Sequence, residues 1–515
     1  MSLLQTKAGK GWKKVGVKHH HGIQIPLLSI WTEKSFGNGE FLDLILLINF
    51  LSDVGMDILQ LLPLNDSGAD PSPYNALSST ALHPIYLSLH ALPYLNSPLP
   101  NFNSETKRIP YWDLLDRKLD FLKRYIHEIG NKITSEKGYQ IFIEKSPHLH
   151  DYALYKVLKD KNKCHLWKKW PDEIRNISKH RRKMLGKNFE NEMSFHLILQ
   201  YLCHTQLEKV KKHAERKGVF LKGDIPILLS PDSADVWAHQ EFFDLTFCAG
   251  SPPNPFDPKG QLWKFPLYKW KVMEKNHFEW WRKRIEVAAK YFHLYRIDHI
   301  LGFFRIWAIP QGKTPAEGLF IPSEAPIMEI QGKKLLETLL SFSEMLPLGE
   351  DLGDPPSFVR ATIKELGIPG TKIFRRYRKW KTDRCFIPYA DYIPASISSV
   401  STHDIETVRL WWERFPEEAK DYASFKGWAY KPNLSLEYQK EILYDNHHSG
   451  SLFHVNLLQE YLALTPELTW GNPEDELINI PGTKNNFNWT YRYRFPLETL
   501  IKSKELKERI QAVLA

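Results

Sequence analysis

The sequence predicts an α/β protein built on a (β/α)8 TIM barrel. Two observations lead to this fold class: short apolar runs rich in β-formers recur between turn residues, and helical patterns follow them. Eight such units occur, which is the number that closes a parallel barrel. The expected strands span residues 22–30, 57–64, 219–225, 292–298, 345–350, 371–375, 396–403 and 477–480.

The spacing of these strands is uneven. Residues 65–217 lie between the second and third strands, whereas a plain βαβ unit spans about 30 residues. This stretch is charged and helix-like, for example over 117–129 and 179–217. We therefore expect a mainly helical inserted subdomain at 65–217, the largest insertion, within one catalytic barrel that covers 22–515 and follows a basic N-terminal lead-in at 1–21.

The net charge of +9 comes from 69 basic and 60 acidic residues. Because this excess is spread thinly along the chain, we do not expect binding to nucleic acid. The lead-in is the exception, and we expect it to be solvated or frayed. Its basic residues are Lys7, Lys10, Lys13, Lys14 and Lys18.

Several classes of protein are disfavoured by short sequence features. The longest apolar runs are too short to span a bilayer, and no secretory h-region is present, so we expect a cytoplasmic protein. The four cysteines form no CxxC pair, which argues against a zinc knuckle or a disulfide framework. His19, His20 and His21 are consecutive, whereas metal ligands must converge from several elements. Neither a GxGxxG pattern nor a P-loop occurs, and no cofactor is expected.

Three acidic residues come directly at the ends of apolar runs: Asp298 in YRIDHI, Glu350 in LGEDLG and Asp404 in STHD. In a (β/α)8 barrel the active site lies at the C-terminal ends of the strands. Each acid alone has an ordinary explanation, namely an ion pair with Arg296, a turn, and a helix N-cap. Three acids at strand ends together favour a catalytic role.

Cleavage of a glycosidic bond with retention of configuration provides a chemical reason for such a set. It needs a nucleophilic carboxylate and a proton-donating carboxylic acid about 5 to 5.5 Å apart, which different strand ends can supply. A third carboxylate can hold sugar hydroxyls and stabilise the oxocarbenium-like transition state. Crowding and burial would keep the donor protonated near neutral pH.

The segments YRIDHILGFFR, GEDLG and STHD, in this order, resemble the signature segments of the 4-α-glucanotransferases, also called amylomaltases or disproportionating enzymes. Five further segments resemble that family, so the similarity extends from about residue 22 to 500. They are LLPLNDSGADPSPYNALS, LKGDIPILLSPDSADVWAH, AGSPPNPFDPKGQLW, INIPGT and FNWTYRYR.

The resemblance implies a covalent glucosyl-enzyme intermediate, with Asp298 as nucleophile, Glu350 as acid/base and Asp404 as transition-state stabiliser. The implied reaction transfers a segment of a 1,4-α-D-glucan to the 4-OH of an acceptor glucan or glucose. The implied substrates are maltose, maltodextrins, and glycogen or starch chains. Positions that match substrate-contacting residues of the family are Ser72, Tyr74, Asp224, Gln261, Trp263, Arg296, His299, His403 and Asn479.

One departure from the family pattern lies beside Trp263. The family usually has a Gly-Asn pair there, whereas this sequence continues with Lys264 and Phe265. The acceptor subsites are the part of the site that this departure affects. Either both side chains point into solvent or the core of the loop, or they reshape an acceptor subsite.

Two alternatives to a transferase remain open. A retaining α-glucan hydrolase would form the same intermediate, and the aromatic residues Tyr74, Phe256 and Trp263 permit acceptor binding without proving it. An inactive glycogen-binding protein is less favoured, because a pure binding protein gains nothing from three desolvated carboxylates.

Overall fold

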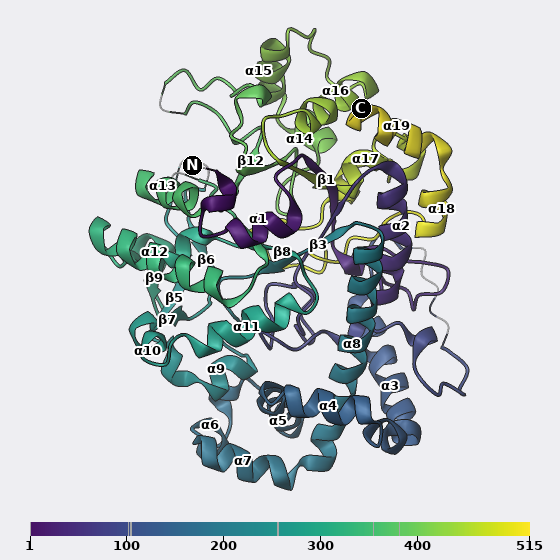
Figure 1. Cartoon of the computed structure of the whole chain (residues 1–515), viewed down its shortest axis with the longest axis vertical. Coiled ribbons are helices and arrows are strands. Elements are labelled where there is room, and N and C mark those ends of the chain that lie inside the picture. Colours follow the sequence, from purple (N-terminus) through teal and green to yellow (C-terminus); the bar gives the residue numbers. More distant parts are fainter. Residues whose placement is uncertain (1, 101, 103–105, 255–256, 354, 381) are drawn as a thin grey trace.

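Eight parallel strands close into a barrel at the centre of the computed structural model (Figure 1). The structure describes residues 2–100, 102, 106–254, 257–353, 355–380 and 382–515. The hydrogen-bonded order is β1-β14-β13-β12-β11-β8-β3-β2, and β1 pairs with β2 to complete the ring, which confirms the predicted fold class. The barrel strands are β1 (His20–Ile25), β2 (Ile58–Leu61), β3 (Phe220–Ile225), β8 (Leu294–Ile297), β11 (Leu346–Gly349), β12 (Gly370–Ile373), β13 (Ser396–Ser399) and β14 (Phe453–Leu457).

The prediction of the eighth strand was wrong. Residues 477–480 are irregular backbone, and β14 completes the barrel instead. Leu477 and Ile478 are apolar because they are buried beneath a loop. The true strand was missed because its apolar run continues without a turn residue into the helix α17 (Leu458–Leu462).

Helices in the connections cover the outside of the barrel (Figure 1). Between β1 and β2 lies α2 (Leu44–Val54), which ends at Gly55 in a left-handed conformation (φ 88°) that glycine adopts without strain. Besides α17, the described helices that follow β3 are α9 (Ala234–Ala238), α10 (Trp270–Lys275), α11 (Glu279–Ala289), α12 (Ala325–Phe342), α13 (Ser357–Leu366), α14 (Val408–Arg414), α15 (Pro416–Lys426), α16 (Leu436–His447), α18 (Leu497–Lys502) and α19 (Lys504–Leu514).

Six helices lie between β2 and β3, and they gather at the bottom of Figure 1. The helix-like stretches 117–129 and 179–217 fall within three of them, α3, α7 and α8. The division of the chain into a lead-in, a barrel and an inserted subdomain stays a prediction. The six helices are α3 (Tyr111–Thr134), α4 (Lys137–Lys145), α5 (His148–Lys161), α6 (Asp172–Arg175), α7 (Lys179–Asn188) and α8 (Glu190–Arg216).

The N-terminal lead-in is not frayed, contrary to the expectation from its charge. It forms α1 (Gly9–Val15), in which Trp12 is fully buried and its indole N–H donates to the carbonyl of Gly367 at 2.8 Å. Trp12 packs with Leu346 and Phe453, the first residues of two barrel strands, so α1 closes the N-terminal end of the barrel. The lysines of the helix lie on its other side, and charge alone did not reveal this apolar face.

Two small sheets that were not predicted stand beside the barrel. The larger one has the order β10-β9-β5-β6 with antiparallel pairing, and its edge strand β6 contains Gln261. Their strands are β4 (Phe243–Asp244), β5 (Phe247–Ser251), β6 (Gln261–Leu262), β7 (Leu267–Tyr268), β9 (Ile306–Pro310) and β10 (Leu319–Ile321).

The strand–helix alternation is interrupted after β12. In the described part of the connection to β13, from 374 to 380 and 382 to 395, there is a single 3-10 turn at Tyr389–Asp391 and no α-helix. On the outside of the barrel, α13 is therefore the α-helix that covers β12, and the described segment after β12 adds no second one.

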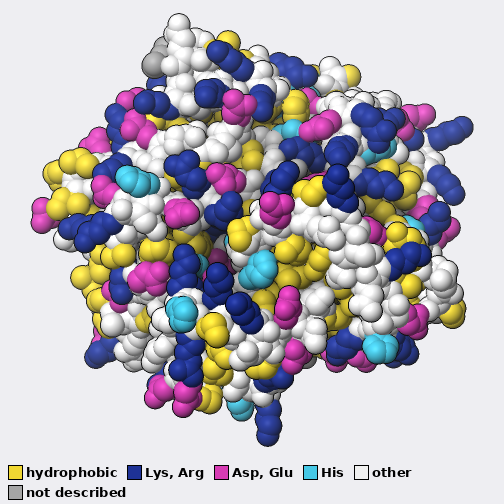
Figure 2. All heavy atoms as spheres, turned by 60° about the horizontal axis from the view of Figure 1, so that its bottom comes forward, with side chains coloured by type: hydrophobic (Ala, Val, Ile, Leu, Met, Phe, Trp, Pro, Cys, Tyr) yellow, Lys and Arg dark blue, Asp and Glu magenta, His cyan; other side chains and the backbone are white. Residues whose placement is uncertain are grey.

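The surface agrees with the thin spread of charge in the sequence. Figure 2 shows basic and acidic side chains intermingled over the face in view. Within the described ranges, no helix is long and apolar enough to cross a bilayer, and no group of three or more His, Cys, Asp or Glu side chains is arranged to hold a metal ion. The expected cytoplasmic location stays a prediction.

Candidate active site

Strand register brings the predicted acids to one place at the C-terminal end of the barrel. Asp224 on β3 pairs with Arg296 on β8, and Ile297 on β8 pairs with Gly349 on β11. Asp298 and Glu350 each follow the last residue of their strand, so the backbone carries them to the same edge. This is the edge at which (β/α)8 barrels place their active sites.

The guanidinium of Arg296 joins three carboxylates. Its Nη1 lies 2.8 Å from Asp224 Oδ2 and 2.8 Å from Asp298 Oδ1, and its Nη2 lies 2.8 Å from Glu350 Oε2. The ion pair between Arg296 and Asp298 is the ordinary explanation that the sequence allowed for an isolated acid. Here the same guanidinium also reaches Glu350, so the pair belongs to a cluster and not to a lone strand-end salt bridge.

Asp404 belongs to an adjoining polar network. Its Oδ2 lies 3.0 Å from His403 Nε2, and its Oδ1 accepts from the side-chain amide of Asn479 at 2.7 Å. Tyr74 links this network to the first, because its hydroxyl donates to Asp224 Oδ2 at 2.8 Å and lies 2.9 Å from His403 Nε2. Asp404 is not a helix N-cap, since α14 begins at Val408 behind Thr407.

Gln24 on β1 is a member of this network that sequence reasoning missed. It is buried, and its amide nitrogen lies 2.8 Å from His403 Nδ1. Because an amide N–H donates there, Nδ1 is the unprotonated ring nitrogen and Nε2 carries the proton. The imidazole therefore presents an N–H to Asp404 and Tyr74. A glutamine inside a barrel strand gives no sequence signal of its own.

Trp489 was also missed as an individual residue, although it lies in the FNWTYRYR segment. Its ring lies 5.5 Å from that of Tyr74 and 5.8 Å from that of His403, measured between centroids. Its φ of 66° is unusual for a large side chain. The three rings form an aromatic wall next to Asp404.

The remaining candidate residues lie at the edge of the cluster. The ring of Trp263 stands 5.0 Å from that of His299, and its indole N–H donates to Gln261 Oε1 at 2.8 Å. Ser72 is in the loop of Tyr74, where its backbone N–H donates to Asp70. Phe256 lies outside the described residues.

The electrostatics of the Asp298–Glu350 pair differ from the sequence expectation. Burial raises the pKa of Asp298, Arg296 opposes this only in part, and the charge of Glu350 adds to it, so the pKa lies well above its usual value. Burial also favours the neutral form of Glu350, but Arg296 and the backbone N–H of His299, 2.9 Å from Oε2, outweigh it and the net pKa is lowered. These directions favour a proton on Asp298 over one on the expected donor, Glu350.

The pKa shifts of the other titrating groups in the site have simpler causes. Although burial acts in the opposite direction, His403 and Asn479 lower the pKa of Asp404 to about 2, so it is ionised at neutral pH. Burial and the neighbouring Asp224 raise the pKa of Tyr74, which keeps its hydroxyl as a donor. Burial lowers the pKa of His299, which favours its neutral form.

The (β/α)8 barrel and the carboxylates that converge at its C-terminal end place this protein in the class of enzymes that act on glycosidic bonds. The comparisons with known proteins identify the group within this class. A family model described as 4-alpha-glucanotransferase matches residues 25–498, and this chain belongs to that family.

Curated relatives agree with this assignment. A 4-alpha-glucanotransferase of Chlamydia caviae is 40% identical over 97% of this chain and 95% of the relative. One from Thermus thermophilus is 31% identical over 86% and 89%. Among solved structures, an amylomaltase from Streptococcus agalactiae in complex with acarbose matches with a TM-score of 0.82 over 96% of this chain and 98% of that one, at 23% identity, and supports the fold.

Proposed function

We propose that this chain transfers segments of α-1,4-glucans by a retaining double displacement in which Asp298 is the nucleophile, Glu350 the acid/base and Asp404 the stabilising carboxylate. The observation that supports this most directly is the bridging of Asp298 and Glu350 by one guanidinium at adjacent strand ends. Two carboxyl groups that share one guanidinium are close together, which suits retention, because inversion needs room for a water between them.

In the first step the Asp298 carboxylate attacks the anomeric carbon of the donor glucan. The bond from that carbon to the glycosidic oxygen breaks, and Glu350 gives its proton to this oxygen as the leaving glucan departs with a free 4-OH. In the second step the 4-OH of an acceptor attacks the same carbon, Glu350 takes its proton, and the ester bond to Asp298 breaks. Two inversions give net retention.

The pKa shifts of the free site oppose the protonation states that this chemistry needs. The pKa is raised for Asp298 and lowered for Glu350, whereas the reaction needs Asp298 ionised and Glu350 protonated. Because the two acids titrate as a pair, binding of the donor glucan shifts the proton towards Glu350 in the proposed reaction. Arg296 stabilises whichever of the two acids is ionised.

We assign the surrounding residues to substrate binding and positioning. Asp404, ionised and held by Asn479, is placed to accept hydrogen bonds from sugar hydroxyls. The wall of Tyr74, His403 and Trp489 offers a face on which a pyranose ring can stack. The full proposed set is Ser72, Tyr74, Asp224, Gln261, Trp263, Arg296, His299, His403, Asn479 and Trp489.

Incubation with maltotriose tests the proposed reaction. We expect glucose together with a series of longer maltooligosaccharides, because an acceptor sugar resolves the intermediate. The same incubation with Asp298→Asn serves as the control and should give no products. Maltose and glucose as the sole products would identify a hydrolase and contradict the proposal. Maltose, maltodextrins and glycogen as donors then define the substrate range.

Phe265 and Lys264, the two residues that depart from the family pattern, have different surroundings in the structure. Phe265 packs against the hydrophobic cluster that contains Ala249 and Leu267, so its role is structural. Lys264 is exposed beside Trp263 and has a φ of 67°, a conformation that suits the glycine usual at this position. The hypothesis of an altered acceptor subsite therefore narrows to Lys264.

We expect Lys264→Gly to stabilise the fold by up to about 1 kcal/mol. The left-handed conformation costs a lysine roughly 1 to 2 kcal/mol, which glycine avoids. Part of this gain is offset because glycine loses more conformational entropy on folding. Lys163→Gly, at another exposed lysine with a φ of 52°, is the matched control and should change stability alone. If Lys264 contacts acceptors, only Lys264→Gly changes the distribution of products from maltotriose. Identical product distributions in both variants would leave Lys264 without an acceptor role.

A further inference from the structure

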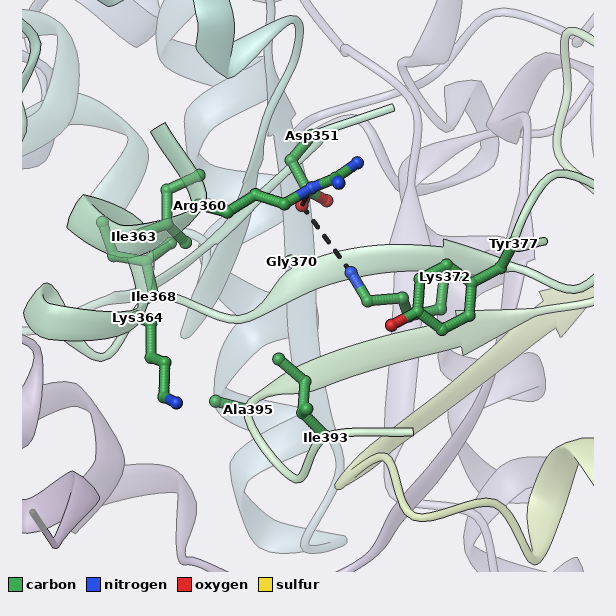
Figure 3. Close-up of a pocket in the computed structure, with 10 residues that line it drawn as sticks. All are labelled: Asp351, Arg360, Ile363, Lys364, Ile368, Gly370, Lys372, Tyr377, Ile393 and Ala395. Atoms are coloured by element: carbon green, nitrogen blue, oxygen red, sulfur yellow. Dashed lines mark ion pairs between the residues drawn. The ribbon is translucent and has the colours of Figure 1, made fainter. Parts of the chain in front are cut away.

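A pocket outside the active site lies on the outer side of β12 (Figure 3). It opens where the connection from β12 to β13 supplies no covering α-helix in its described part. One wall comes from α13, the floor from β12, and the far side from the segment just before β13. Its cavity volume is about 110 Å³. Ile363, Ile368 and Ile393 make the walls largely apolar.

A buried lysine forms the floor of this α13 pocket. The layer between a barrel strand and its covering helix is normally filled by apolar side chains, but Lys372 on β12 is only 5% exposed. Its Nζ points into the space beside Asp351 in Figure 3, 3.6 Å from Asp351 Oδ2. This distance exceeds that of a normal hydrogen bond. Burial lowers the pKa of Lys372, and Asp351 only partly offsets this.

The charges around the pocket do not balance. Three cationic side chains line it, Arg360, Lys364 and Lys372, against the single carboxylate of Asp351. Arg360 Nε also stays 3.7 Å from Asp351 Oδ2. The other oxygen, Oδ1, is already engaged, because it accepts from the backbone N–H of Thr371 at 2.7 Å. Lys372 is the buried cation of this set, and its Nζ donates to the carbonyl oxygen of Thr371 at 3.3 Å, whereas Arg360 and Lys364 are exposed. The pocket therefore retains an excess of positive charge, and a bound anion would give the buried ammonium a stronger partner.

The size of the pocket limits the ligand. At 10 to 15 Å³ for each water-sized site, the cavity holds on the order of ten small heavy atoms. A glucan segment is too large, whereas a phosphate or a carboxylate on a short carbon chain fits. The arginine and the lysines are donors that suit such oxyanions.

We propose that the α13 pocket binds a small oxyanion, a phosphate or a carboxylate, through Lys372 and Arg360. The site is linked to the catalytic centre along the chain, because Asp351 directly follows Glu350. An anion that draws Lys372 and Arg360 away from Asp351 changes the contacts that hold the end of β11, so occupancy should alter the rate of glucan transfer.

Thermal unfolding of the full-length protein with increasing inorganic phosphate tests this proposal. Sodium chloride keeps the ionic strength constant, because general screening would otherwise change stability. We expect a saturable rise in Tm for the wild type. Lys372→Met, which keeps the length and apolar stem of the side chain, should weaken the apparent affinity roughly tenfold or more, since a charged hydrogen-bond donor is lost.

Arg360→Gln, at an exposed position where loss of folding is not expected, should also weaken the affinity. Lys502→Met, at an exposed lysine on α18, is the matched control and should leave it unchanged. A parallel titration with propionate decides between phosphate and carboxylate as the preferred ligand. The proposal is overturned if neither anion gives a saturable shift, or if Arg360→Gln responds to both as the wild type does.

Discussion

Replacing Asp298 by Asn should lower the rate of glucan transfer by about 10⁴-fold or more. The residue supplies the atom that forms the covalent bond to the sugar, and an amide oxygen is a far weaker nucleophile than a carboxylate. Loss of a covalent nucleophile costs more than loss of a single transition-state hydrogen bond, which is about 10² to 10³ in rate. Initial rates with maltotriose measure the effect.

The fold should survive this change. Burial raises the pKa of Asp298, so at neutral pH folding favours a protonated Asp298 over the ionised form of the unfolded chain, and this costs stability. A neutral amide of the same size removes this cost, so we expect Tm to stay the same or to rise. Asp120→Asn, at an exposed acid on α3, is the matched control and should keep full activity. Activity within tenfold of the wild type in Asp298→Asn would contradict the assignment.

The fold class and the positions of Asp298 and Glu350 at strand ends could be predicted because both leave local patterns in the sequence. Asp404 was expected directly after a strand over 396–403, but β13 ends at Ser399 and Asp404 lies in the loop that follows. An acid that ends an apolar run marks a strand end, and parallel strands in one barrel bring their ends together. Asp298 and Glu350 are the clearest cases, since their strands are direct neighbours in the sheet. The resemblance to a family then supplied the roles.

The parts that could not be predicted depend on contacts between distant segments. Gln24 acts through His403, 379 residues away in the chain, and nothing in its neighbours distinguishes it from other strand residues. The helix α1 was hidden because its lysines dominate its composition, while Trp12 contributes the packing. The described part of the connection after β12 contains no α-helix, and this opening beside α13 became visible only in the assembled barrel.

The location of the proton is a further property that composition could not give. Crowding of acids predicts that one of them is neutral, but not which one. Arg296 Nη2 and the backbone N–H of His299 both reach Glu350 Oε2 and favour its ionised form, whereas burial favours the neutral form of Asp298. Donor geometry at a single oxygen decides this, and the sequence does not encode it locally.

Replacing Glu350 by Gln should lower the rate with maltotriose by about 10³-fold, because the leaving glucan then departs without a proton. A donor whose leaving group needs no proton tests this reason directly. With α-maltosyl fluoride, we expect the initial burst of fluoride to fall by less than about tenfold. Glu329→Gln, at an exposed position on α12, is the matched control for both substrates.

The pH dependence of the rate with maltotriose gives the sharper result. In the wild type the coupled pair should give a bell, whose acidic limb is the uptake of a second proton and whose alkaline limb is the loss of the shared one. In Glu350→Gln only Asp298 titrates, so the alkaline limb should disappear. The remaining limb, the ionisation of Asp298, should lie at lower pH than the alkaline limb of the wild type, because the charge of Glu350 no longer raises the pKa of Asp298. An alkaline limb that persists unchanged in Glu350→Gln would show that another group donates the proton.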